Sequence, residues 1–417
     1  MPPGPAGPGG HPQGARREAS SIESLLASKE IVIACGSGGV GKTTTAAAAA
    51  VMAAVRHGGK VLVVTVDPAK RLAGALGLSG FGNEERRVPP AAFDAAGVTP
   101  RGELWAAMLD TKKSWDDLVR RHAPDHQTEA RILENPLYQN IAGKFVQSHD
   151  YIAMERLYEL HTSGAYDLIV VDTPPTRNAV DFLEAPQRMA EFFSSRLLRL
   201  LIVPYRSRLV NMASRPFYQI ADRILGSQFL ADVAEFFILF QTMYDGFVQR
   251  AGAVERLLHA SRTTFVVVST LEAAPAREAE YFIKVLGDKG FSLGALVLNK
   301  TLPPYLLDEA AGRRAQRLCS SAADLAGRAG GGGEAGGGGE AGGGDLAASV
   351  GSDPAVLERV LAEVGENFRN FMVVAQREAA QRSQLASAPE VVATVPEFEQ
   401  DIFDLRGLVR LGERIWN

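Results

Sequence analysis

Cysteine is scarce in this sequence, and its scarcity excludes several structural classes. Only Cys35 and Cys319 occur among the 417 residues, and no C-x-x-C pair is present. A disulfide scaffold and a cysteine zinc site are therefore not expected, because both need several cysteines at short, recurring spacings. This cysteine usage is typical of a reducing compartment, so we expect a cytoplasmic protein.

Long hydrophobic runs and an excess of one charge are also missing. No stretch of about 18 apolar residues occurs, and the most apolar region, 197–204, is too short to span a bilayer. The N-terminal region is rich in proline and glycine and lacks the apolar segment of a signal peptide. The net charge is -4, with both signs interspersed. We therefore expect neither stable membrane insertion nor a nucleic-acid partner.

The clearest chemical signal lies in residues 31–50. An apolar segment, 31–35, predicts a strand, and a run of alanines after residue 45 predicts a helix. Between them, residues 36–44 fit the phosphate-binding pattern G-x-x-x-x-G-K-[ST]. Such a loop turns backbone N–H groups toward phosphate oxygens at the positive end of a helix. The predicted nucleotide-binding residues of this loop are Gly38, Gly39, Val40, Gly41, Lys42, Thr43 and Thr44.

Two side chains of this loop have particular roles. Lys42 is expected to reach the β- and γ-phosphates, which gives it a catalytic as well as a binding role. The hydroxyl of Thr43 is expected to hold Mg²⁺. The alternative, a chance glycine turn before a helix, does not account for the strand and helix that flank the loop.

Apolar segments alternate with helical patterns along most of the chain. Residues 79–102 look irregular, whereas 128–163 look helical with a break at Pro136. Further strands are predicted at 60–66, 103–109, 166–171, 264–268, 293–298 and 391–395. Strands that alternate with helices form a parallel sheet, so we predict an α/β fold: a parallel β-sheet flanked by helices.

Polar residues follow three of these strands, at the sheet edge where α/β proteins bind ligands. Asp172 ends an apolar strand and suits a Walker B carboxylate that organises Mg²⁺, often through water; a capping or turn role is its alternative. Asp67 can orient or deprotonate an attacking water, or it can form the turn before Pro68. Asn299 can offer its amide to a purine through two hydrogen bonds, or it can be an ordinary turn residue.

Composition and pattern also divide the chain into segments. Residues 1–19 form an expected disordered tail, because they are low in apolar content. Residues 20–185 and 261–417 are expected to form the α/β core, with a helical subdomain, 186–260, inserted between them. Residues 329–345 are almost all glycine, alanine and glutamate, so they are expected to form a flexible linker within the core.

Two of the helical stretches have alternative uses. The inserted subdomain has an apolar stripe with Met189, Met212 and Met243, which predicts either ordinary core packing or a groove for an apolar helix. The terminal stretch 403–416 is expected to close the fold as a helix, with membrane docking as the alternative.

Together, the motif residues resemble the ArsA-type ATPases, the arsenite-pump and tail-anchored-protein-targeting ATPases of the deviant Walker A P-loop NTPase class. The resemblance covers residues 29–300 and, more weakly, 385–416, and is greatest to the actinobacterial members. It implies Mg-dependent hydrolysis of ATP to ADP and phosphate, with Asp67 in switch I and Asp172 in switch II. It also implies a dimer that opens and closes with nucleotide and handles a hydrophobic or membrane-protein client.

The sequence departs from the family pattern at three places. Members usually carry, at the position of Ser37, a lysine that reaches the partner's phosphates. A Ser37 homodimer is therefore expected to hydrolyse ATP slowly, unless a paralogous ATPase supplies the lysine in a heterodimer. The family's arsenite-binding and zinc-binding cysteines have no counterparts, and Arg177 stands where a switch II glycine is common.

Two alternative functions stay open. One is a low-turnover, nucleotide-binding structural subunit of a heteromeric complex, which Ser37 favours. The other is a ParA/MinD-like partition ATPase, which the balanced charge disfavours.

Overall fold

A computed structural model describes this chain at residues 21–66, 70–78, 82–141, 146–173, 183–185, 187–188, 191, 227–330, 353–385 and 391–416. In this part of the chain, eight strands form one sheet in the order β3-β4-β2-β5-β1-β6-β7-β8. Six of the seven strand pairs are parallel; the exception is β3, which runs antiparallel to β4 at one edge of the sheet. The prediction of an α/β fold with a parallel sheet is therefore confirmed, with one antiparallel edge strand added.

The parallel strands are short and mainly apolar, as buried parallel strands must be, while the antiparallel edge strand β3 consists of two exposed arginines. Their bounds are β1 (Ile31–Cys35), β2 (Lys60–Thr65), β3 (Arg86–Arg87), β4 (Glu103–Met108), β5 (Leu168–Asp172), β6 (Thr263–Ser269), β7 (Leu293–Thr301) and β8 (Val391–Pro396). Every residue of β1, β5 and β6 is buried. Because β1 lies between β5 and β6, the segment that precedes the glycine-rich loop occupies the middle of the sheet.

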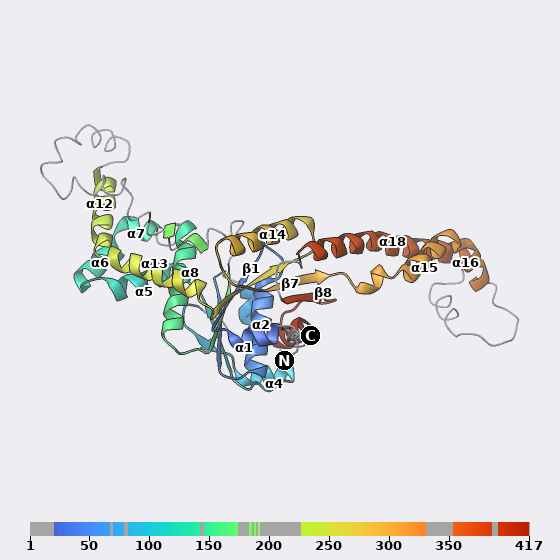
Figure 1. The fold of residues 1–417 in the computed structure, drawn as a ribbon, viewed down its shortest axis with the longest axis horizontal. Helices are drawn as coiled ribbons and strands as arrows, with labels where there is room; N and C mark the ends of the chain where they lie inside the picture. Colours follow the sequence, from blue (N-terminus) through green and yellow to red (C-terminus); the bar gives the residue numbers. More distant parts are fainter. Residues whose placement is uncertain are drawn as a thin grey trace, which may run out of the picture.

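Helices cover both faces of the sheet (Figure 1). Alternate side chains of β1 point to opposite faces: Ile31 and Ile33 belong to one apolar core, Val32 and Ala34 to the other. The second core is closed by α1 (Ile22–Ser28), α2 (Lys42–Arg56), α4 (Pro90–Ala96) and α19 (Leu405–Trp416). A short helix, α3 (Lys70–Ala75), follows β2 and adds Leu72 to this core.

The first core continues into a cluster of helices at one end of the molecule (Figure 1). The helices are α5 (Thr111–His122), α6 (His126–Glu134), α7 (Pro136–Ile141), α8 (Val146–Thr162), α12 (Ser227–Gln241) and α13 (Tyr244–His259), while α14 (Ala273–Asp288) packs on β6. Stacked and tilted rings join these helices, among them Trp115 with Tyr151 and Phe240 with Phe247. Aromatic rings supply much buried area per residue, so this cluster holds the helical end together.

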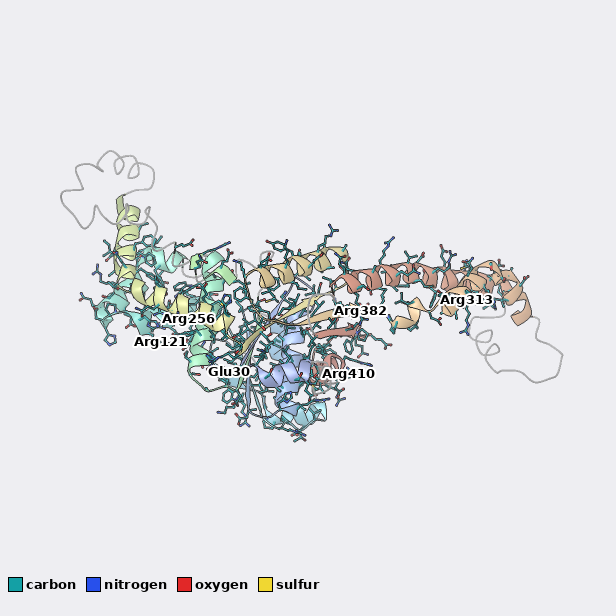
Figure 2. The ribbon with its side chains drawn as sticks, viewed as in Figure 1. Glu30, Arg121, Arg256, Arg313, Arg382 and Arg410 are labelled. Atoms are coloured by element: carbon teal, nitrogen blue, oxygen red, sulfur yellow. The ribbon has the colours of Figure 1, made fainter. Side chains whose placement is uncertain are left out.

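A helical arm extends from the opposite end of the sheet (Figure 1). It consists of η1 (Pro304–Leu307), α15 (Glu309–Ser320), α16 (Ala322–Gly330) and the long helix α18 (Pro354–Leu385). Figure 2 labels Arg382 where α18 meets the sheet and Arg313 farther out along the arm. In the sequence, the arm lies between β7 and β8, and the predicted linker 329–345 lies almost wholly outside the described residues.

One local prediction needs correction. Residues 79–102 are not all irregular, because β3 and α4 form there; a two-residue strand and a seven-residue helix are too short to show periodicity. The terminal stretch forms the expected closing helix, α19. Its apolar face packs on α2, so closely that a Cβ on Gly412 would lie 2.1 Å from Met52 Cγ.

Candidate functional site

The glycine-rich loop joins β1 to α2 at the carboxyl edge of the sheet. Gly36 lies against the end of β6, where an added Cβ would be 2.1 Å from the carbonyl oxygen of Val268. Gly41 caps the N-terminus of α2 with a left-handed backbone, φ 94°, which favours glycine. The loop glycines thus allow a close approach to β6 and a sharp entry into the helix, as a phosphate-binding loop requires.

Lys42 is the first residue of α2, and its side chain turns back over the loop. It is only 6% exposed, and Nζ donates a hydrogen bond to the carbonyl oxygen of Ser37 at 2.7 Å. The ammonium group is therefore held at the loop, where a phosphate oxygen could replace or join the carbonyl as its acceptor. Thr43 and Thr44 follow in the first turn, half-buried beside the exposed backbone of Gly38 and Gly39.

Asp172 ends β5 and is completely buried, with 0% of its surface exposed. The hydroxyl of Thr65, the last residue of β2, donates to Oδ2 of Asp172 at 2.9 Å. The next residue, Thr173, donates through Oγ1 to the carbonyl oxygen of Ala34 in β1 at 2.9 Å. These hydrogen bonds connect the ends of three strands beside the loop and fix the position of the carboxylate.

Thr65 was not among the residues that sequence reasoning selected. Its signal is its place at the end of an apolar strand, one residue before the polar turn that contains Asp67. In the sheet, Thr65 lies opposite Asp172 in the parallel pairing of β2 with β5. A short hydroxyl side chain at this register position can orient a carboxylate that binds a metal.

Cys35 lies directly before the loop and is fully buried at the end of β1. Burial raises the pKa of its thiol to about 12. Burial thus favours the protonated thiol, whereas nucleophilic cysteines have a lowered pKa.

Asn299 lies near the end of β7 and contacts the loop directly. Its Nδ2 donates to the carbonyl oxygen of Val40 at 2.8 Å, and a Cβ on Gly41 would lie only 2.3 Å from that nitrogen. One amide N–H thus holds the loop, while the second N–H and the amide oxygen are the groups that could meet a purine edge. Lys300, which follows, has φ 55°, and it is the one non-glycine residue of the described chain in the left-handed region.

The end of β8 is a further segment at this edge that sequence reasoning did not use. Thr301 of β7 pairs with Pro396 of β8, and the Glu397 backbone N–H donates to the carbonyl oxygen of Thr301 at 3.2 Å. The turn after β8 therefore lies beside Thr301, two residues after Asn299. The available signal was the same one that identified Asp172: an apolar strand that ends in a polar cluster.

The structure thus brings Lys42, Thr43, Asp172 and Asn299 to one edge of the sheet. Asp67 and residues 174–182, which include Arg177, lie outside the described residues. Ser37 is half-buried in the loop, and its Oγ has no hydrogen-bond partner among the described residues. The carboxyl edge therefore carries a phosphate-binding loop, a buried carboxylate and an amide in contact with the loop.

Comparison with known proteins agrees with this geometry. The family model described as anion-transporting ATPase matches residues 29–317, which include the loop, Asp172 and Asn299. The chain belongs to this family. The resemblance to the ArsA-type ATPases is confirmed, and the protein is an ATPase.

Curated relatives share the same region at low identity. The chain is 27% identical over 291 residues to the ATPase get3 of Pyrenophora tritici-repentis, covering 69% of this chain and 78% of that protein. It is 26% identical over 289 residues to the ATPase get3 of Aspergillus terreus, covering 68% and 77%. A putative arsenical pump-driving ATPase 1 of Aquifex aeolicus is 22% identical over 287 residues, covering 67% and 65%. The three alignments cover about two thirds of this chain, so they carry no information about the remaining third.

No helix in the described ranges is long and apolar enough to cross a membrane. The same ranges contain no group of three or more His, Cys, Asp and Glu side chains that could hold a metal ion.

Proposed function

We propose that this ATPase binds ATP with Mg²⁺ at the loop 36–44 and uses binding and hydrolysis to open and close a dimer that handles a hydrophobic client. The observation that carries the proposal is the convergence of Lys42, Asp172 and Asn299 on one edge of the sheet, beside the loop. In this proposal, Lys42 and the loop N–H groups bind the β- and γ-phosphates. Asn299 offers its remaining amide groups to the base.

The residues at this edge fit a magnesium ion. Thr43 provides a hydroxyl at the start of α2, and Asp172 provides a buried carboxylate that Thr65 orients through a 2.9 Å hydrogen bond. These two residues would hold the ion, with Asp172 acting through a water molecule. When bound, Mg²⁺ neutralises charge on the phosphates as they react. Asp67 would orient or deprotonate the attacking water.

Contacts between α8 and α13 support a coupling between the site and the helical end. α8 leads into β5, whose last residue is Asp172, and α8 packs against α13. Glu155 of α8 lies 2.5 Å from Arg250 of α13, and Tyr151 donates to the same carboxylate at 2.8 Å. Burial raises the pKa of Glu155, although Arg250 and Tyr151 oppose this effect. A buried ion pair of this kind resists separation, so a displacement of β5 would move both helices together.

The proposed client would bind at the helical end of the molecule. In its described part, Met243 is only 3% exposed in the core with Phe240 and Phe247, which supports core packing for these residues, while Val248 is 38% exposed. The apolar stretch that includes Met189 and Met212 lies outside the described residues.

Ser37 supports a second candidate, a low-turnover subunit that needs a lysine-bearing paralogue as its dimer partner. Ser37 contributes its carbonyl oxygen to Lys42 but no positive charge. A charge that a partner inserts at the phosphates can change turnover by orders of magnitude. Both candidates share the nucleotide site and differ in whether one chain is sufficient for hydrolysis.

The test measures Mg²⁺-dependent ATP turnover by the purified chain, by Ser37→Lys and by Ser37→Met, which matches lysine in length without its charge. We expect slow turnover by the wild type, a rise of about tenfold or more in Ser37→Lys, and no rise in Ser37→Met. The absence of turnover in all three proteins, and also with a lysine-bearing paralogue, would refute the proposed reaction.

Asp67→Asn separates the remaining candidates. We expect it to lose turnover but to retain ATP binding, because the loop that holds the phosphates is unchanged. Fast turnover by the wild type that disappears in Asp67→Asn would exclude the low-turnover subunit. Co-sedimentation with DNA or liposomes at low salt would instead favour a ParA/MinD-like partition role.

A further inference from the structure

The helical arm leaves part of its apolar surface uncovered. One face of α18 packs on α15 and α16, with a Cβ on Gly365 placed 2.6 Å from the carbonyl oxygen of Ala315. The side chains of this covered face are buried or half-buried and recur at helical spacing: Leu357, Leu361, Gly365, Phe368, Met372 and Ala375. This contact uses only one side of a 32-residue helix.

A second stripe runs along α18 beside the covered face. We call it the arm seam; its residues are Val360, Val364, Asn367, Phe371 and Val374. Val364 and Phe371 are each 53% exposed, Val374 is 43% exposed, Val360 is half-buried and Asn367 is exposed. Their spacing alternates between four and three residues, which is the pattern of a helix that packs against another helix along its length.

The two faces of α18 point in nearly perpendicular directions. At about 100° per residue, the arm seam is centred about 90° around the helix from the covered face. A helix docked on the seam would therefore not displace α15 or α16. It would add a second layer beside them, as in a four-helix bundle.

We propose that the arm seam binds the same seam of a second copy of this chain, with the two α18 helices antiparallel. In this pairing Asn367 lies on the two-fold axis, where the two amides can donate and accept reciprocally. Val364 then faces Phe371 of the partner subunit, and Val360 faces Val374 of the partner subunit. A single polar Asn in an otherwise apolar seam fixes register, because any shift leaves the amides opposite hydrocarbon.

The residues beside the seam agree with the antiparallel direction. Glu363 faces Asn370 of the partner subunit, so no like charges meet, and α15 and α16 of both copies lie on the same side of the paired helices. A parallel pairing would place Glu363 against Phe368 of the partner subunit and put the short helices on opposite sides. Only the antiparallel pairing closes a four-helix bundle.

The expected strength of this contact follows from its length. From Val360 to Val374 the seam spans about 21 Å at a rise of about 1.5 Å per residue. This is shorter than a standard protein interface, so the contact should be weak and concentration-dependent by itself. The family match ends at residue 317, so α18 lies beyond it, and the seam is not part of the nucleotide site.

Site-directed cross-linking tests the pairing and its direction. The full chain carries Cys319→Ser, while Cys35 remains because it is buried. Val360→Cys and Val374→Cys are prepared separately, and a short bis-maleimide is added to each protein and to their mixture without nucleotide. We expect a covalent dimer that joins residues 360 and 374 in the mixture. Little dimer is expected from Val360→Cys alone, because its two copies lie about 21 Å apart in the antiparallel pair.

Val373 provides a matched control, since it is 47% exposed but points away from the seam. Val364→Glu should lower the cross-linked yield by at least about tenfold, and Val373→Glu should not. Asn367→Val should raise self-association, measured by sedimentation velocity, while it loosens the register. A mixture that cross-links no better than Val373→Cys would overturn the proposal. Efficient cross-linking of Val360→Cys with itself would overturn the antiparallel pairing.

Discussion

The contact between Gly41 and Asn299 allows a quantitative test of how the loop is held. Replacing Gly41 with Ala has two separable effects. The left-handed backbone, φ 94°, costs an alanine about 1–2 kcal/mol relative to glycine. The new Cβ would also lie 2.3 Å from Nδ2 of Asn299, so the amide must turn away and lose its hydrogen bond to Val40. That bond contributes about 0.5–1.5 kcal/mol. Gly41→Ala should therefore lower the free energy of unfolding by about 2–3 kcal/mol.

A double-mutant cycle isolates the second effect. Asn299→Ala loses the hydrogen bond but relieves no backbone strain, and it also removes the atom that Gly41→Ala would strike. In the double variant the hydrogen bond is lost only once, so the double variant should be about 1 kcal/mol more stable than the sum of the single changes predicts. The assay is urea denaturation of the ligand-free protein, with each variant's unfolding free energy compared with that of the wild type.

Gly39 supplies the control for backbone strain. It has φ 80°, but an added Cβ would meet no atom within 4 Å. Gly39→Ala should therefore cost only the strain, about 1–2 kcal/mol, and should be additive with Asn299→Ala within about 0.5 kcal/mol. Additivity of Gly41→Ala with Asn299→Ala, or equal losses for Gly39→Ala and Gly41→Ala, would refute the reasoning.

Three further predictions concern the lysine, the linker and a histidine. Lys42→Ala should weaken binding of a fluorescent ATP analogue by on the order of 100-fold, because the loop loses its one charged donor; retained affinity would contradict its role. Deletion of 330–344 should leave turnover and the melting temperature nearly unchanged, since loop-closure entropy depends only weakly on length; a large loss of thermal stability would show a structural role. Burial, with Arg250 and then Arg121 nearby, lowers the pKa of His122 to about 4. Between about pH 6.5 and 4 the unfolded chain therefore binds a proton that the folded chain does not. The free energy of unfolding should decrease as the pH is lowered through this window, and His122→Asn should reduce the slope of the unfolding free energy against pH.

The arrangement of residues at the carboxyl edge of the sheet was largely predictable because its signals are local. The glycines and Lys42 lie within nine residues of each other, and the flanking strand and helix have strong intrinsic patterns. Asp172 and Asn299 were also recognisable, because each ends an apolar strand, and parallel strands bring their carboxyl ends to one edge. The α/β fold follows from the same alternation of strands and helices.

The interactions that hold these residues in place were not predictable from local pattern. Thr65 and Asp172 are 107 residues apart, and their hydrogen bond depends on the register of β2 against β5. A helical pattern in the sequence does not reveal which face of a helix a neighbouring helix covers. The arm seam became visible only when α15 and α16 were found to occupy the adjacent face of α18.

Ser37 shows why the structure of the loop could be predicted from the sequence more fully than its rate of hydrolysis. The loop uses the backbone carbonyl of residue 37 to hold Lys42, and every residue type supplies that carbonyl. A serine in place of the lysine that the family resemblance implies therefore leaves the internal hydrogen bond of the loop intact. The side chain of residue 37 can act only on groups outside this hydrogen bond, and a serine side chain carries no charge. The backbone hydrogen bond of the loop is thus independent of the residue type at position 37, whereas the proposed rate of hydrolysis depends on that side chain's charge.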